Sequence, residues 1–181
     1  LLLAAAVLPA RAQDPQPESG SGWRDKQSVT SSRFMVAAAH PLATRAGYDV
    51  LKRGGTAADA AVAVQMVLNL VEPQSSGIGG GAFLLYWDAE SKTLHTIDGR
   101  ETAPAAATPE RFLEPDGAKM KFIKAVVGGH SVGVPGTLRL LEAVHKRFGR
   151  IPWAALFEPA VALAEKGFRV SPRLAASIAK A

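Results

Sequence analysis

The 181-residue sequence contains no cysteine. Disulfide bonds, a thiolate nucleophile and cysteine metal ligands are therefore excluded. Histidine is also scarce, and the four histidines, His40, His95, His130 and His145, include no pair spaced i, i+4. Because a metal site would lack the usual ligand spacing, we expect no metal. No other cofactor is expected.

Long hydrophobic runs are missing from most of the chain. Residues 57–71 are interrupted by three polar side chains and fall short of the roughly 20 residues that cross a bilayer. Residues 1–12 differ, because an apolar run ends in the small-x-small triplet Ala10-Arg11-Ala12, which indicates signal-peptide cleavage before Gln13. A basic start and an initiator methionine are absent, so we interpret these residues as the remnant of a leader. We expect a periplasmic or secreted protein with no membrane association after leader removal.

Acidic residues are slightly outnumbered, with 16 Asp and Glu against 21 Lys and Arg, a formal net charge of +5. The basic residues are scattered. The only tight group, Lys119, Lys121 and Lys124, includes one aromatic residue, Phe122. This pattern gives no support for nucleic-acid binding and is typical of a solvated loop.

Hydrophobic period and turn residues predict the order of the elements. Residues 13–33 are rich in Pro, Ser, Gly and charge and are interpreted as a flexible lead-in, and the folded part is expected over residues 34–181. Thr56 and Asp59 have the cap-and-acid spacing of a helix start. The predicted elements are a buried strand at 34–39, helices at 41–53, 56–71, 137–148 and 160–166, a β-hairpin of strands 82–87 and 94–98, a brief strand at 131–134, a helical turn at 152–157 and a final helix starting at Ser171.

Arg100 directly follows the predicted hairpin, shortly after the glycine cluster at residues 77–81. A guanidinium at the end of a rigid strand presents paired planar donors that match a carboxylate. Its neighbours Asp98 and Glu101 also allow a local salt bridge, which is the competing interpretation. The glycine cluster lies between a helix and a strand, the reverse of the order in dinucleotide and P-loop sites, so we do not expect a nucleotide.

Four motifs follow one another along the chain, at residues 51–63, 77–83, 98–104 and 134–137, and residues 159–168 extend the set. Together they resemble the amino-terminal part of the large subunit of γ-glutamyltranspeptidase (glutathione hydrolase), over about residues 34–181. The resemblance implies an α+β fold, the αββα sandwich of N-terminal nucleophile hydrolases, of which this chain holds a part. It also implies a precursor that cuts itself into a large and a small subunit.

The resemblance further implies an enzyme that attacks glutathione or another γ-glutamyl donor and forms a γ-glutamyl ester. The acceptor is an amino acid, a dipeptide or water. In the family the nucleophile is the first threonine of the small subunit, so no catalytic residue is expected in this chain. By resemblance Arg100 holds the α-carboxylate of the donor, and Glu101 and Asp98 are candidate supporting residues.

Two other functions stay open. A β-lactam acylase of the cephalosporin type, in the same superfamily, would keep the fold and change the acyl group. A non-catalytic periplasmic binding protein would agree with the absence of a complete catalytic set from these residues. We also expect that residues 1–181 do not fold well alone, because the alanine-rich surface requires a partner.

Overall fold

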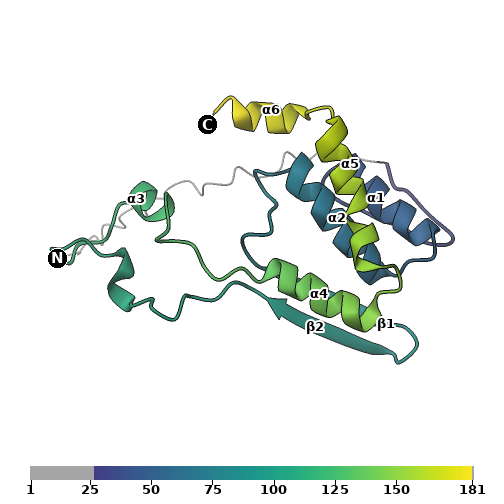
Figure 1. Cartoon of the computed structure of the whole chain (residues 1–181), viewed down its shortest axis with the longest axis horizontal. Helices are drawn as coiled ribbons and strands as arrows, with labels where there is room; N and C mark the ends of the chain where they lie inside the picture. The colour runs from purple at the N-terminus through teal and green to yellow at the C-terminus, as the bar shows by residue number, and fades with distance from the viewer. Residues whose placement is uncertain (1–26, 181) are drawn as a thin grey trace, which may run out of the picture. The chain divides into compact units, whose positions relative to one another are not determined.

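Helices α1 and α2 pack against each other at the centre of the core (Figure 1). The computed structural model describes residues 27–180, and the predicted leader (1–12) and most of the predicted lead-in (13–33) lie outside them. Residues 27–32 contain no helix or strand, and the description below concerns the unit that begins at Arg33. Its elements are α1 (Pro41–Lys52), α2 (Ala57–Val71), β1 (Ala82–Asp88), β2 (Thr93–Gly99), the 3₁₀ turn η1 (Pro109–Phe112), α3 (Phe122–Val126), α4 (Thr137–Phe148), the 3₁₀ turn η2 (Trp153–Leu156), α5 (Glu158–Lys166) and α6 (Pro172–Ile178).

The ends of α1 follow from local sequence. Pro41 occupies the first turn, where its missing N–H would have no helical partner, and the His40 ring accepts a hydrogen bond from the Leu42 N–H at 3.2 Å. After the helix, Gly54 adopts φ +90°, a conformation that glycine reaches without steric cost. The predicted helix and its glycine stop are therefore confirmed.

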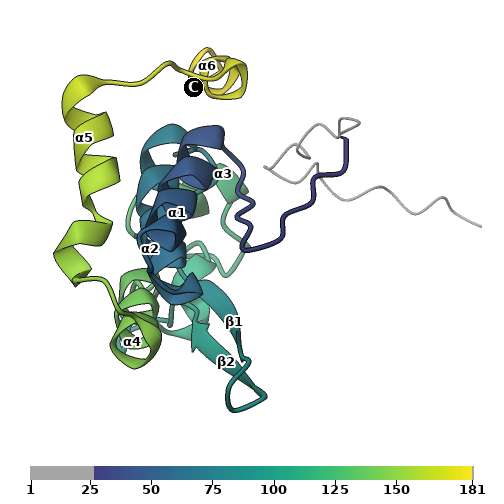
Figure 2. The same ribbon diagram turned by 90° about the vertical axis from the view of Figure 1, so that its right-hand side faces the viewer.

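Small residues let α1 and α2 approach closely. A Cβ atom at Gly47 of α1 would lie 2.6 Å from a methyl carbon of Val64 on α2. α2 is buried on several sides, because α4 and α5 also pack against it (Figure 2). The central position predicted for this helix is confirmed. Within residues 27–180, no helix is both long and apolar enough to span a membrane.

Strands β1 and β2 form the predicted antiparallel hairpin, in a register that pairs Ala82 with Gly99 and Trp87 with Leu94. One face packs on the core, where the Tyr86 ring stacks on Phe148 of α4 with the ring centroids 4.1 Å apart. The hairpin thus lies against α4, and its second strand ends beside the start of that helix.

Two strand predictions were wrong. Residues 34–38 are extended and alternate between half-buried and exposed, but they join no sheet in the described part of the chain. Their contacts are made with α1 instead, as in the pair of rings Phe34 and Tyr48, 5.2 Å apart. The strand expected at 131–134 is reduced to one bridge between Val134 and Thr102. An apolar run indicates burial, and it becomes a strand only where a partner offers free backbone groups.

The carboxyl-terminal half follows its predicted order with small shifts. The helix expected at 160–166 begins at Glu158, because Pro159 fits in the first turn of a helix. Gly167 ends it with φ +78°. Ser171 accepts a hydrogen bond from the Leu174 N–H at 3.1 Å and starts α6 as expected. The 3₁₀ turn η1 and the short helix α3 lie between the hairpin and residue 131, where no helix or strand was predicted.

The outer face of the hairpin is apolar and exposed. Phe83, Leu85 and Trp87 alternate along β1, and Leu94 lies opposite Trp87 on β2; Leu85 is 69% exposed. A face of this kind in water favours association or loss of fixed packing. We expect the isolated 181-residue chain to melt broadly and to bind a hydrophobic dye, measured by near-ultraviolet circular dichroism and dye fluorescence. A sharp cooperative melt without dye binding would contradict this expectation.

Candidate functional site

Arg100 is exposed directly after β2, and its backbone is fixed while its head group is free. Its N–H donates a hydrogen bond to Asp98 Oδ1 at 2.8 Å. Within residues 27–180 the Arg100 guanidinium makes no ion pair and no hydrogen bond. Neither of its neighbours Asp98 and Glu101 pairs with it. The local salt bridge considered from sequence is not formed, and the charge is available to an anion.

Two of the sequence motifs meet at this arginine. The backbone of Gly81, from the glycine cluster, lies so close that a Cβ there would stand 2.6 Å from the Arg100 Cα. Such a distance is shorter than any relaxed carbon–carbon contact, so the approach requires glycine. The structure therefore brings residues 77–81 and 98–104 together, which sequence spacing alone does not show.

Glu101 and Asp98 occupy different surroundings. The Glu101 side chain is half-buried and lies across two glycines, since a Cβ at Gly81 would collide with its carboxylate and one at Gly133 would lie 2.9 Å from its Cγ. Asp98 is exposed and acts on the backbone through its bond to the Arg100 N–H. Neither carboxylate holds the guanidinium: Asp98 bonds the Arg100 backbone, and Glu101 lies against the two glycines.

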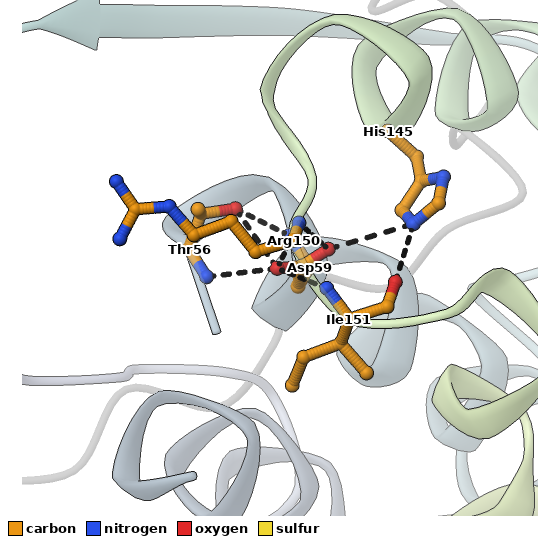
Figure 3. Close-up of polar contacts among 5 residues, drawn as sticks. All are labelled: Thr56, Asp59, His145, Arg150 and Ile151. Carbon is orange, nitrogen blue, oxygen red and sulfur yellow. Dashed lines mark hydrogen bonds and ion pairs between the residues drawn. The ribbon is translucent and has the colours of Figure 1, made fainter. Parts of the chain in front are cut away.

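A second polar centre surrounds Asp59, which is fully buried (Figure 3). Asp59 Oδ2 accepts hydrogen bonds from the backbone N–H of Thr56 at 2.9 Å and of Arg150 at 3.0 Å. Ile151 donates to the same oxygen at 3.3 Å. The predicted cap of α2 is confirmed, and the same carboxylate also anchors the loop that follows α4.

His145 completes this centre. Its Nε2 lies 2.8 Å from the Ile151 carbonyl oxygen and 3.6 Å from Asp59 Oδ1. Because a carbonyl oxygen only accepts, Nε2 carries a hydrogen. The His145 ring packs against Trp153 at a centroid distance of 5.1 Å. Since the carboxylate is buried and its acceptors are used by these donors, the centre stabilises the fold and is not a site of chemistry.

Sequence reasoning found the local half of the Asp59 centre and missed the distant half. The spacing of Thr56 and Asp59 predicts a capping box, but not the contact with Arg150, 91 residues further on. One feature could have predicted it. A helix cap uses few of the roughly four acceptor positions of a carboxylate, so a carboxylate that is buried needs further donors.

A surface groove along α4 is lined by charged and apolar side chains: Leu138, Arg139, Glu142, His145, Lys146 and Trp153. Hydrogen bonds from Lys146 and, secondly, from Arg139 lower the pKa of Glu142. These exposed ion pairs neutralise one another and contribute little to stability. In the described part of the chain, no three His, Asp or Glu side chains form a group that could hold a metal.

Solved structures with the same arrangement define the class of protein. Gamma-glutamyltranspeptidase of Helicobacter pylori superposes with a TM-score of 0.80 at 35% identity, over 85% of this chain and 44% of that one. The enzyme from Pseudomonas nitroreducens, complexed with L-DON, superposes with a TM-score of 0.78 at 34% identity, over 83% of this chain and 44% of that one. Cephalosporin acylase from Bacillus halodurans superposes with a TM-score of 0.62 at 36% identity, over 83% of this chain and 29% of that one. The fold is α+β and of the N-terminal nucleophile hydrolase class, and this chain holds part of it.

Sequence relatives give the family. The family model described as gamma-glutamyltranspeptidase matches residues 43–181. Glutathione hydrolase proenzyme of Bacillus subtilis strain 168 is 46% identical over 178 residues, which is 98% of this chain and 30% of that protein. Its counterpart in Escherichia coli K12 is 36% identical over 96% of this chain, again with 30% of that protein covered. The chain belongs to the gamma-glutamyltranspeptidase family of enzymes, and it spans about 30% of the length of these relatives.

Removal of the Asp59 carboxylate is expected to destabilise the protein strongly. Asp59→Ala leaves three partly buried backbone N–H groups without an acceptor and a cavity in place of a buried carboxylate, so the free energy of unfolding should fall by roughly 3 kcal/mol or more. Asp49→Ala, which breaks an exposed pair with Arg45, is the matched control and should change it by less than about 0.5 kcal/mol. Urea unfolding of the complete protein measures both. Equal effects of the two substitutions would refute the anchoring role.

Proposed function

We propose that the complete protein transfers and hydrolyses γ-glutamyl groups of glutathione and related γ-glutamyl amides. Membership of the family and the names of the relatives support the activity. The observation that carries the proposal is the unpaired Arg100 guanidinium, exposed on a backbone held by Asp98 and by the glycine cluster. A fork of donors carried on a fixed backbone suits one carboxylate of a small donor molecule.

The proposed reaction runs in two steps through an ester. A threonine hydroxyl attacks the γ-carbonyl carbon, the amide C–N bond breaks, and the amine leaves with the proton. Water, an amino acid or a dipeptide then attacks the ester and returns the threonine hydroxyl. We place this threonine at the start of a small subunit cut from the same precursor, where its own α-amino group serves as base.

The threonines of this chain are not proposed as nucleophiles. The Thr56 hydroxyl oxygen caps α2 by accepting from the Asp59 N–H at 3.2 Å. The Thr137 hydroxyl donates to the Gly80 carbonyl oxygen at 3.1 Å. Both hydroxyls have structural partners. The carboxylate beside the Thr56 hydroxyl, Asp59 Oδ2 at 3.2 Å, is itself held by the backbone N–H groups of Arg150 and Ile151.

Arg100 is proposed to bind the α-carboxylate of the donor. The α-carboxylate does not change in the reaction, so its bond to Arg100 contributes alike to the ground state and the transition state. Its loss should appear mainly in KM. Glu101 and Asp98 are proposed to support Arg100 through the backbone.

The domain plan and location also belong to this proposal. We propose a leader remnant at residues 1–12, a lead-in at 13–33 and the first part of the large subunit at 34–181. The apolar start and the triplet Ala10-Arg11-Ala12 support export to the periplasm or the medium.

Substitution of Arg100 tests the proposed function. In the complete protein, Arg100→Ala should raise KM for a γ-glutamyl anilide about tenfold to a hundredfold, the equivalent of one charge-assisted hydrogen bond. Arg100→Lys should recover only part of the loss, because an ammonium lacks the planar fork. Arg45→Ala removes another exposed arginine, from α1, and should leave KM unchanged. An undiminished kcat/KM in Arg100→Ala would refute the assignment.

The cephalosporin acylase neighbour supports a second candidate, a β-lactam acylase. We expect the complete protein to hydrolyse a γ-glutamyl anilide faster than a glutaryl cephalosporin, because the glutaryl group keeps the carboxylate that Arg100 is proposed to bind but lacks the α-amino group of the γ-glutamyl donor. Parallel assays give the ratio, and the reverse preference would favour the acylase.

A denaturing gel should show two bands after maturation. One uncut, inactive chain would favour a binding protein.

A further inference from the structure

The carbonyl oxygen of Gly80 accepts hydrogen bonds from three donors at the start of α4. Gly136 N–H lies 2.9 Å away, Thr137 N–H 3.2 Å and Thr137 Oγ1 3.1 Å. The Thr137 residue is only 2% exposed, whereas Gly80 is exposed, so the donors of Thr137 lie on the buried side of these bonds. A single carbonyl thus joins the glycine cluster to a helix that starts 57 residues later.

The Thr137 hydroxyl is not used to cap its own helix. α4 has Gly136 at its N-cap and no side-chain cap. A threonine in the first turn is free to point away from the axis, and here it bonds a distant segment. Its geometry therefore calls for a role other than helix initiation.

The same turn of α4 touches both backbone segments that flank Arg100. Gly136 lies against the carbonyl oxygen of Gly99, where a Cβ would collide, and the Leu140 side chain fills the space beside Gly99. On the other side, Gly81 follows Gly80 and lies against the Arg100 Cα. The hydroxyl of Thr137 is thus connected to the Arg100 backbone through two residues.

A further bond closes the arrangement beyond Arg100. The Val134 N–H donates to the Thr102 carbonyl oxygen at 2.8 Å, shortly before α4 begins. The backbone of residues 99–102 is therefore held against one rigid helix start. This fixes the point of the backbone from which the guanidinium reaches a ligand, and a bidentate carboxylate contact needs such positioning.

We propose that Thr137 is a positioning residue for donor binding: its hydroxyl holds the Gly80 carbonyl, and this sets the place of Gly81 against Arg100. The inference rests on the proposed function, because it assumes that Arg100 binds the donor carboxylate. Thr137 itself touches no substrate. Its removal should loosen the Arg100 backbone while leaving the helix and the core in place.

The test compares two donors in the complete protein. One is a γ-glutamyl anilide with a free α-carboxylate, and the other carries an α-carboxamide. Thr137→Val removes the hydroxyl and keeps the shape, and should raise KM for the carboxylate donor about threefold to tenfold, the worth of one hydrogen bond. KM for the amide donor and kcat should not change, and Thr137→Ser should restore KM.

A double substitution shows whether the effect passes through Arg100. In an Arg100→Ala background, Thr137→Val should raise KM no further. Thr93→Val is the matched control, because it removes an exposed hydroxyl that bonds the Ser91 carbonyl at the far end of the same hairpin. If Thr137→Val does not fold, Thr137→Ala serves in its place, and thermal melts identify the folded variants.

Different failures have different meanings. A normal KM in Thr137→Val beside a raised KM in Arg100→Ala overturns the inference alone. So does an equal rise for both donors, or a full additive rise in the double variant, since either indicates a general structural defect. An unchanged KM in Arg100→Ala overturns the role of Arg100 in the proposed function, and the inference with it.

Discussion

Helix α4 is held at both ends by buried polar groups, and the position of Arg100 depends on this constraint. At its start, Gly136 and Thr137 bond the carbonyl oxygen of Gly80. At its end, the loop through Arg150 is bonded to the carboxylate of Asp59 on α2. At each end one partner is buried, Thr137 or the Asp59 carboxylate, and loss of its hydrogen bonds would leave that buried group unsatisfied, which is costly. The helix therefore transmits the rigidity of the core to the hairpin and to the arginine at its end.

Three backbone segments meet around Arg100, and their close approach explains why the sequence motifs are rich in glycine. Glycine at 81, 99 and 136 is required by close backbone approach, where a Cβ would collide with Arg100, Leu140 or the Gly99 carbonyl. At these three positions glycine permits close packing of the backbone. With the backbone packed in this way, the Arg100 guanidinium remains exposed and unpaired. An exposed guanidinium agrees with membership of a family of enzymes that act on γ-glutamyl compounds.

Much of the local structure was predictable from the sequence, because it follows from local chemistry. Pro41 and Gly54 mark the ends of α1, the Thr56–Asp59 spacing marks the start of α2, and alternation marks the hairpin. Contacts between distant segments were not predictable in this way. The reach of Asp59 to Arg150 and the bond from Thr137 to Gly80 depend on which elements meet in space. The apolar run at 34–39 failed as a strand for the same reason, since no pattern within it reports whether a partner edge is available.

The most direct test of the central claim is a crystal structure of the complete protein with a bound γ-glutamyl analogue. The account predicts two guanidinium nitrogens of Arg100 at about 2.7–2.9 Å from the two oxygens of the α-carboxylate, with the Thr137 hydroxyl still bonded to the Gly80 carbonyl. An analogue whose α-carboxylate is held by other groups, with Arg100 turned to solvent, would contradict it.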